Sequence, residues 1–239
     1  MTRSNLLLSM CMLVLCGILV AGLWPFHVPR NEVTWLNGIN GLLFGKHGTI
    51  LSASPFKADD SENDGSCSLE MWLQPNRVDS GGVILTFYRP DSGFVQFAAR
   101  QYRGGLVLER ETQSHVGKKR STYVGDVFDR LKPVFVTITS GKREAATYIN
   151  GALIDNFPSF PFSRGDLTGE LIIGNAAMTP YTWSGQFKGL AIYDRELTAA
   201  EVSQHYATWT ENKQAGLAKS RGVVALYLFD EGSGSVVHS

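Results

Sequence analysis

Short apolar runs separated by turn residues fill the chain from about residue 33 to residue 209. In residues 67–73 every second side chain is apolar, which is the period of a half-buried strand. Residues 134–139 are strongly β-branched, and Asn150-Gly151 is the dipeptide that favours a type I′ hairpin turn. The sequence shows no long amphipathic helix between these runs, which argues against a parallel α/β sheet. An antiparallel β-sandwich is therefore predicted.

A short helix is predicted directly after residue 198. Thr198 and Glu201 have the spacing of a capping box, in which each side chain accepts a hydrogen bond from the other residue's backbone N–H. Leu197 and Val202 occupy the positions of a hydrophobic staple across the same helix start. Val202 and Trp209 lie on one helical face, so we expect this face to pack against an apolar surface.

The N-terminal segment has a different composition from the rest. Residues 6–24 form a run of nineteen residues without a charge. As a helix this run would be roughly 28 Å long, close to the hydrocarbon thickness of a bilayer. The run is longer than the apolar part of a usual signal peptide, and no clear Ala-x-Ala cleavage site follows it. We therefore expect an uncleaved signal anchor, with secretion as the alternative if the segment is cleaved. Arg3 favours a cytoplasmic N-terminus and an extracytoplasmic domain.

Charge and cysteine usage exclude some classes of function. The 22 Lys and Arg residues balance the 22 Asp and Glu residues, so nothing in the overall charge favours nucleic acid as a partner. Cys67 is the one cysteine outside the apolar segment, so no disulfide can form within the domain. Its place in an alternating strand suggests a small buried hydrophobic side chain.

Several motifs in order resemble one known family. The stretch 186–206 joins a glycine-containing strand to the capped helix, and residues 67–75 read CSLEMWLQP. Residues 148–151 read YING and residues 171–174 read LIIG. Together they resemble a laminin-G-like (LamG) domain. This resemblance implies an all-β, concanavalin A-like antiparallel sandwich, or jelly roll, with one short C-terminal helix after an N-terminal transmembrane helix.

Three regions are expected along the chain. Residues 1–28 would be the signal anchor, residues 29–212 the LamG-like domain, and residues 213–239 a linker with an extra strand. That last strand either completes the sandwich or begins a further module. LamG-like domains behind an N-terminal anchor also occur fused to VanZ-like membrane modules, so the resemblance admits such a fusion.

Aromatic side chains are the candidates for ligand binding. Exposed aromatic rings stack on the faces of sugar rings, with hydrogen-bonding groups beside them. Residues 181–183 lie in a segment bounded by Pro and Gly and are the most loop-like. The predicted binding residues are Tyr181, Trp183, Trp72 and Tyr123, and Tyr88 and Tyr102 are also available.

A calcium ion is possible but its ligands are not determined by the sequence. The resemblance implies a calcium site at the rim of the sandwich, for which Asp166, Asn175 and Asp230 have suitable side chains. The acidic loop at residues 60–65 superficially resembles a calcium loop. Its twelfth position is Met71 instead of a bidentate glutamate, so we interpret it as a solvated loop.

An enzyme is not expected. Glycosidases need two carboxylates across the scissile bond. The Glu-x-Asp of this sequence, Glu62-Asn63-Asp64, lies in a polar loop, and Glu70 stands alone on its strand. We therefore expect an extracytoplasmic binding module for carbohydrate or a cell-envelope protein. The alternatives are a structural ectodomain of a larger VanZ-like membrane protein, and a glycoside hydrolase-like enzyme.

Overall fold

The computed structural model describes residues 3–23, 30–57, 65–111, 119–128, 130–177, 181–211 and 214–239. The chain divides into two compact units, residues 1–31 and residues 32–239, which we describe separately. The described part of the first unit is the helix α1 (Arg3–Leu23), whose side chains are all exposed. It has a mean hydropathy of 2.7 and is long and apolar enough to cross a membrane, properties that a signal sequence shares.

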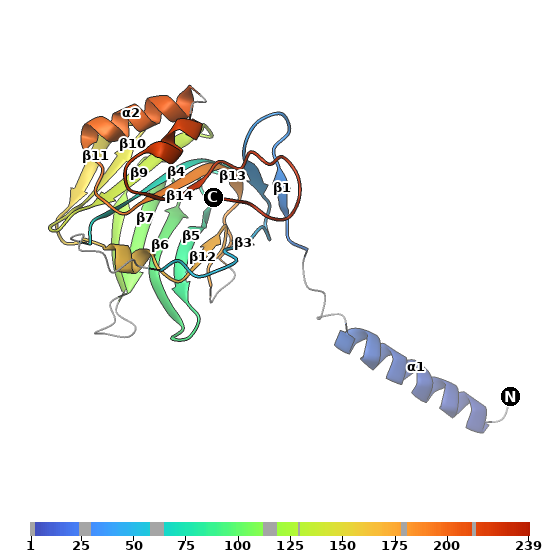
Figure 1. Cartoon of the computed structure of the whole chain (residues 1–239). Coiled ribbons are helices and arrows are strands. Elements are labelled where there is room, and N and C mark those ends of the chain that lie inside the picture. The colour runs from blue at the N-terminus through green and yellow to red at the C-terminus, as the bar shows by residue number, and fades with distance from the viewer. Residues whose placement is uncertain are drawn as a thin grey trace. The chain divides into compact units, whose positions relative to one another are not determined.

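The second unit is an antiparallel β-sandwich, which confirms the predicted fold (Figure 1). Among the described residues, one sheet has eight strands and the other has six. The eight-stranded sheet runs β1 (Val33–Trp35), β2 (Leu42–Phe44), β13 (Gly185–Tyr193), β4 (Cys67–Pro75), β9 (Val134–Ser140), β10 (Ala145–Ile149), β11 (Ala152–Phe157), with β14 (Val223–Tyr227) also paired to β13. The six-stranded sheet runs β3 (Ile50–Leu51), β12 (Glu170–Ile173), β5 (Gly81–Arg89), β6 (Phe94–Tyr102), β7 (Gly105–Glu111), β8 (Lys119–Val124).

The alternation of side chains along the strands builds the core between the sheets. On β4, Cys67, Leu69, Met71 and Leu73 all have no exposed surface and belong to one core cluster. The burial of Cys67 raises the pKa of its thiol well above the ordinary value, because the thiolate would lose its hydration. Cys67 is thus a small core side chain rather than a reactive thiol.

The strand β14 and the residues after it pack within the second unit. β14 pairs with β13, and Phe229 beyond it is 1% exposed. The carbonyl oxygen of Phe229 accepts a 2.9 Å hydrogen bond from the Gly41 N–H, and the Trp35 indole N–H donates one of the same length to the Gly234 carbonyl. The C-terminal strand therefore adds to the eight-stranded sheet.

The helix α2 (Ala199–Thr210) covers the outer face of the eight-stranded sheet (Figure 1). Its start has the predicted capping box. The Thr198 hydroxyl accepts a hydrogen bond from the Glu201 N–H at 3.3 Å, and the Glu201 carboxylate accepts one from the Thr198 N–H at 2.8 Å. The apolar face of the helix docks on a second cluster of buried side chains, which include Phe135, Tyr148, Tyr193, Leu197, Val202, Trp209 and Leu226.

The start of α2 leads to a prediction about pH. Both carboxylate oxygens of Glu201 accept hydrogen bonds from the Arg195 guanidinium, at 2.7 and 2.9 Å, and with Thr198 these lower the Glu201 pKa to about 2. Because the folded-state pKa lies below the unfolded one, the charged carboxylate stabilises the fold above about pH 4.5 and progressively less towards pH 2. We expect Glu201→Gln to destabilise the domain by about 1 kcal/mol at pH 7, a value kept small by solvent screening.

Urea unfolding at several pH values checks this expectation. The difference between wild type and Glu201→Gln should shrink as the pH falls from about 4.5 towards 2, since the wild-type carboxylate then becomes protonated. A difference that stays constant over this range would show that the charge of Glu201 does not stabilise the helix start.

Candidate functional site

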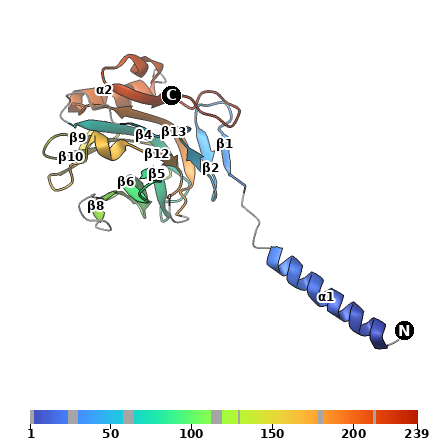
Figure 2. The same ribbon diagram turned by 60° about the horizontal axis from the view of Figure 1, so that its bottom comes forward.

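The outer face of the six-stranded sheet carries three partly exposed tyrosines. Within residues 32–239, the one described α-helix packs on the other sheet, on the far side of the sandwich (Figures 1 and 2). Tyr102 ends β6 and is 46% exposed, Tyr123 on β8 is 52% exposed, and Tyr181 next to β5 is 53% exposed. We call these three side chains the tyrosine row.

Strand register brings the members of the row together. Tyr102 is directly opposite Gly81 on β5 and Gly105 on β7, so all three residues face the same side of the sheet. A Cβ on residue 105 would collide with the ring of Tyr123 where it now lies, so a glycine at this position lets the ring keep that place. The ring of Tyr181 lies 3.9 Å from the position that a Cβ on Gly81 would take. Gly105 therefore leaves space for the Tyr123 ring beside Tyr102, and the Tyr181 ring lies within ordinary contact distance of the Gly81 position.

Two arginines flank the centre of the row. The guanidinium carbons of Arg100 and Arg103 lie 5.8 and 5.5 Å from the centroid of the Tyr102 ring, within cation–π range. Arg100 also pairs with Glu109 at 2.8 Å. Arg103 is exposed in the turn after β6, with a positive φ of 54°, and has no carboxylate partner among the described residues. The row thus combines aromatic faces with guanidinium hydrogen-bond donors.

A buried amide lies beneath the row. Gln101 has no exposed surface, and its Nε2 donates to the carbonyl oxygens of Arg77, Val78 and Arg103 at 2.8, 3.1 and 3.2 Å. Its Oε1 accepts a 2.9 Å hydrogen bond from the indole N–H of Trp183. All hydrogen-bonding groups of this amide are therefore used inside the protein.

Comparison with known proteins identifies the family of this sandwich. Residues 50–203 match the family model of the concanavalin A-like lectin/glucanases superfamily. The chain belongs to this superfamily. The LamG-like resemblance of the sequence is thereby confirmed. No curated protein matches the chain.

Solved structures of toxin binding domains share the sandwich. The binding domain of Paraclostridial Mosquitocidal Protein 1 is 14% identical, with a TM-score of 0.57 over 76% of this chain and 47% of that one. The receptor-binding domain of botulinum neurotoxin D is 15% identical, with a TM-score of 0.53 over 75% and 46%. The binding domain of botulinum neurotoxin DC, solved in complex with SialylT, is 17% identical, with a TM-score of 0.55 over 75% and 45%. This chain thus spans about half the length of these proteins, and at such identities the likeness shows the fold.

The four predicted binding residues lie in three different places in this lectin/glucanase sandwich. Tyr181 and Tyr123 belong to the row, together with Tyr102, which the sequence analysis noted without selecting. Trp183 is 1% exposed and lies in the core, so its ring has no free face for a sugar, and the prediction for this residue is corrected. Trp72 lies on the opposite sheet, where it packs edge-to-face against Trp209 at 5.9 Å. The register of Tyr102 with Gly81 and Gly105 is the signal that sequence reasoning missed.

The predicted metal ligands have different roles and lie on separate elements. The Asp166 carboxylate accepts hydrogen bonds from the N–H and the hydroxyl of Ser163 at 2.7 and 3.1 Å. Asn175 donates to the Thr49 hydroxyl at 3.2 Å, and Asp230 is exposed after β14. No group of three or more His, Cys, Asp or Glu side chains suited to a metal occurs in the described parts of the chain. A calcium site therefore stays a prediction. The acidic loop at residues 60–65, with Glu62 and Asp64, lies almost wholly outside the described residues.

A buried polar cluster joins α2 to the eight-stranded sheet. Glu70 on β4 has no exposed surface, and its carboxylate accepts hydrogen bonds from the Tyr193 hydroxyl at 2.8 Å and from Nδ1 of His205 at 3.0 Å. Burial and the nearby Glu70 charge raise the pKa of Tyr193, so its hydroxyl stays protonated and donates. The cluster lies under the helix, away from the tyrosine row. Among the described residues, the side chains that hydrogen-bond to Glu70 are Tyr193 and His205, and together they join α2 and β13 to β4.

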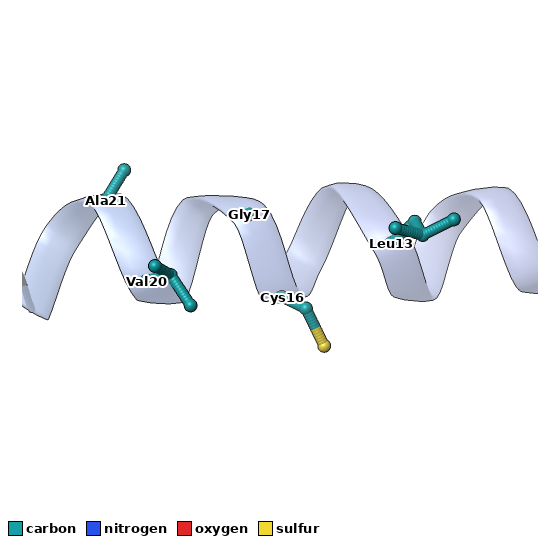
Figure 3. Close-up of a pocket in the computed structure, with 5 residues that line it drawn as sticks. All are labelled: Leu13, Cys16, Gly17, Val20 and Ala21. Carbon is teal, nitrogen blue, oxygen red and sulfur yellow. The ribbon is translucent and has the colours of Figure 1, made fainter.

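A surface hollow on α1 has no carbohydrate-binding chemistry. Leu13, Cys16, Gly17, Val20 and Ala21 line it, and Figure 3 shows only carbon atoms and the Cys16 sulfur in these side chains. Gly17, which has no side chain, is one of the residues that line it. A sugar would find no strong hydrogen-bonding side chain there, so this feature suits packing in an apolar environment.

Proposed function

We propose that residues 32–239 form a carbohydrate-binding module whose site is the tyrosine row. The observation that carries this proposal is the gathering of Tyr102, Tyr123 and Tyr181 on the outer face of the six-stranded sheet, each about half exposed. Half-exposed aromatic rings are apolar surface that a binding partner can cover, and tyrosine adds a hydroxyl for hydrogen bonding.

The chemistry of the row fits a sugar. The apolar faces of pyranose rings stack on aromatic rings, while the phenol hydroxyls and guanidiniums bind sugar hydroxyls or acidic groups. Neighbouring strands are about 4.8 Å apart, so the row offers stacking positions across several strands rather than a single small pocket. The botulinum neurotoxin DC binding domain solved in complex with SialylT supports a glycan as ligand by likeness of fold.

The helix α1 supports a membrane-anchored form of the module on the extracytoplasmic side. Its length and apolar composition suit a span, and Arg3 lies at its N-terminal end. In this arrangement the row would meet glycans of the cell envelope or cell surface. Protease treatment of intact cells would test the arrangement, because only a domain outside the membrane would be cleaved. The VanZ-like fusion stays a prediction.

Removing the rings of the row tests the proposed function. We expect Tyr102→Ala to lower the affinity for an oligosaccharide about tenfold, because each well-packed interfacial aromatic contributes on the order of 1–2 kcal/mol. The triple variant with Tyr123→Ala and Tyr181→Ala should bind no glycan. The measurement is a glycan array with neutral, sialylated and cell-wall oligosaccharides, using the full chain in nanodiscs, with calcium and with EDTA.

Tyr206→Ala provides the matched control. Tyr206 lies on α2 over the other sheet, packed against Phe135 at 5.9 Å, so its loss should leave glycan binding unchanged. A wild-type protein that binds no glycan in either condition would overturn the proposal and favour a structural ectodomain. Binding that disappears only in EDTA would show that the module needs calcium.

A further inference from the structure

We infer that Gln101 is the positioning residue of the tyrosine row, and this inference rests on the function proposed above for that row. Gln101 comes directly before Tyr102 on β6, so the two side chains point to opposite faces of the sheet. Tyr102 faces solvent, whereas Gln101 is fully buried and forms four hydrogen bonds beneath it.

The four hydrogen bonds hold three separate segments. The two N–H groups of the amide are shared among carbonyl oxygens of the turn after β4, at Arg77 and Val78, and of the turn after β6, at Arg103. The amide oxygen holds the segment at Trp183. Loops on a protein surface are ordinarily mobile, so a buried amide that joins three of them restricts all three at once.

Each held segment borders a member of the row. The segment at Trp183 carries Tyr181, whose carbonyl oxygen also accepts a 2.9 Å hydrogen bond from the Val83 N–H. The turn at Arg103 places its guanidinium 5.5 Å from the Tyr102 ring. The turn at Arg77 and Val78 leads into β5 at Gly81, and the Tyr181 ring lies 3.9 Å from the position that a Cβ on Gly81 would take. Gln101 therefore fixes the positions of the tyrosine rings through the segments that it holds, and it does not itself contact a ligand.

The same strand contains a matched comparison. Gln96 lies near the other end of β6, is 3% exposed, and its Nε2 donates to the Gly165 carbonyl at 2.9 Å and to the Thr168 hydroxyl at 2.8 Å. Gln96 is thus an equally buried amide with internal partners, but its partners belong to the segment 165–168 and not to the row. If both glutamines had a purely structural role, replacing Gln96 or Gln101 would change stability and glycan affinity in the same way.

The experiment compares Gln101→Met with Gln96→Met in the full chain in nanodiscs. Methionine keeps the length of glutamine and removes its hydrogen bonds, so we expect both variants to lower the melting temperature by similar amounts. Only Gln101→Met should weaken binding of the array oligosaccharide that wild type binds most tightly, by about tenfold. With 3-fluorotyrosine incorporated, the fluorine signals of Tyr102 and Tyr181 should broaden or split in Gln101→Met, with buried Tyr193 as the internal reference.

The outcomes separate this inference from the proposed function. Equal affinities of Gln101→Met and Gln96→Met, or unchanged Tyr102 and Tyr181 signals, would overturn the positioning role while leaving glycan binding intact. If wild type binds no glycan, the proposed function fails, and the fluorine signals alone decide whether Gln101 positions the rings. Trp183→Phe removes one of the four hydrogen bonds and should disturb the Tyr181 signal alone, which keeps the test valid if Gln101→Met does not fold.

Discussion

Replacing Glu70 with alanine is expected to destabilise the domain by about 2–5 kcal/mol, because two buried groups each lose a hydrogen-bond acceptor at a cost of roughly 1–3 kcal/mol. The Tyr193 hydroxyl and the His205 ring would lose their acceptor in a site without solvent, and a cavity would remain under α2. Glu70→Gln should have a smaller effect, because the amide fills the space and keeps one acceptor. Urea unfolding followed by tryptophan fluorescence measures both.

The pair formed by Glu231 and His238 is the control for Glu70. It consists of the same residue types at 3.3 Å, but the His238 side chain is 78% exposed. Solvent screening should hold the effect of Glu231→Ala below about 1 kcal/mol. Similar losses for Glu70→Ala and Glu231→Ala would contradict the burial argument. Folded Glu70→Ala protein should still bind glycan, because the cluster and the tyrosine row lie on different sheets.

Gly189→Ala is the second substitution for which we expect a large effect, about 2–3 kcal/mol of destabilisation. Gly189 lies in β13 directly beneath α2, and a Cβ there would collide with the six-membered ring of Trp209. Trp209 has no exposed surface and packs against Trp72 and Phe135 at 5.9 Å each, so it has no free space to move into. The helix must therefore shift away from the sheet.

A double-mutant cycle with Trp209→Leu tests the cause of this effect. Once the indole is replaced by a smaller side chain, the added methyl of Gly189→Ala has room, so the second substitution should have little further effect. Gly216→Ala is the control, because a Cβ at that position meets no atom within 4 Å. Additive losses for Gly189→Ala and Trp209→Leu would show that the glycine acts through strand flexibility and not through contact with the ring.

The elements that could be predicted from the sequence are those encoded by residues close together in the chain. The alternation in β4, the Asn150-Gly151 hairpin and the capping box at Thr198 each depend on residues close together in the chain, and each is present in the structure. The start of α2 was predicted correctly because a cap and a staple are complete within a few residues. These signals identify strands and helix ends, and in the right order they identify the superfamily.

The candidate site could be predicted only in part. Tyr123 and Tyr181 were selected as exposed aromatics, but Trp183 was selected for the same reason and is buried. The Pro and Gly residues around it indicate a loop without indicating which side chain of the loop turns inward. Glu70 likewise read as an isolated acid, because its partners Tyr193 and His205 come from elements more than 120 residues away.

The sequence by itself determined where several strands lie, the capped helix, the apolar N-terminal segment and the family. Each of these depends on local periodicity or spacing. Only the tertiary structure decided which aromatics share a surface. Tyr102, Tyr123 and Tyr181 share one face because strand register places Tyr102 opposite Gly81 and Gly105, with the Tyr181 ring beside Gly81 and the Tyr123 ring beside Gly105. The register of Tyr102 with Gly105 follows from the two-residue turn between them, whereas Tyr181 reaches this face through pairing with Val83, which is distant in the sequence.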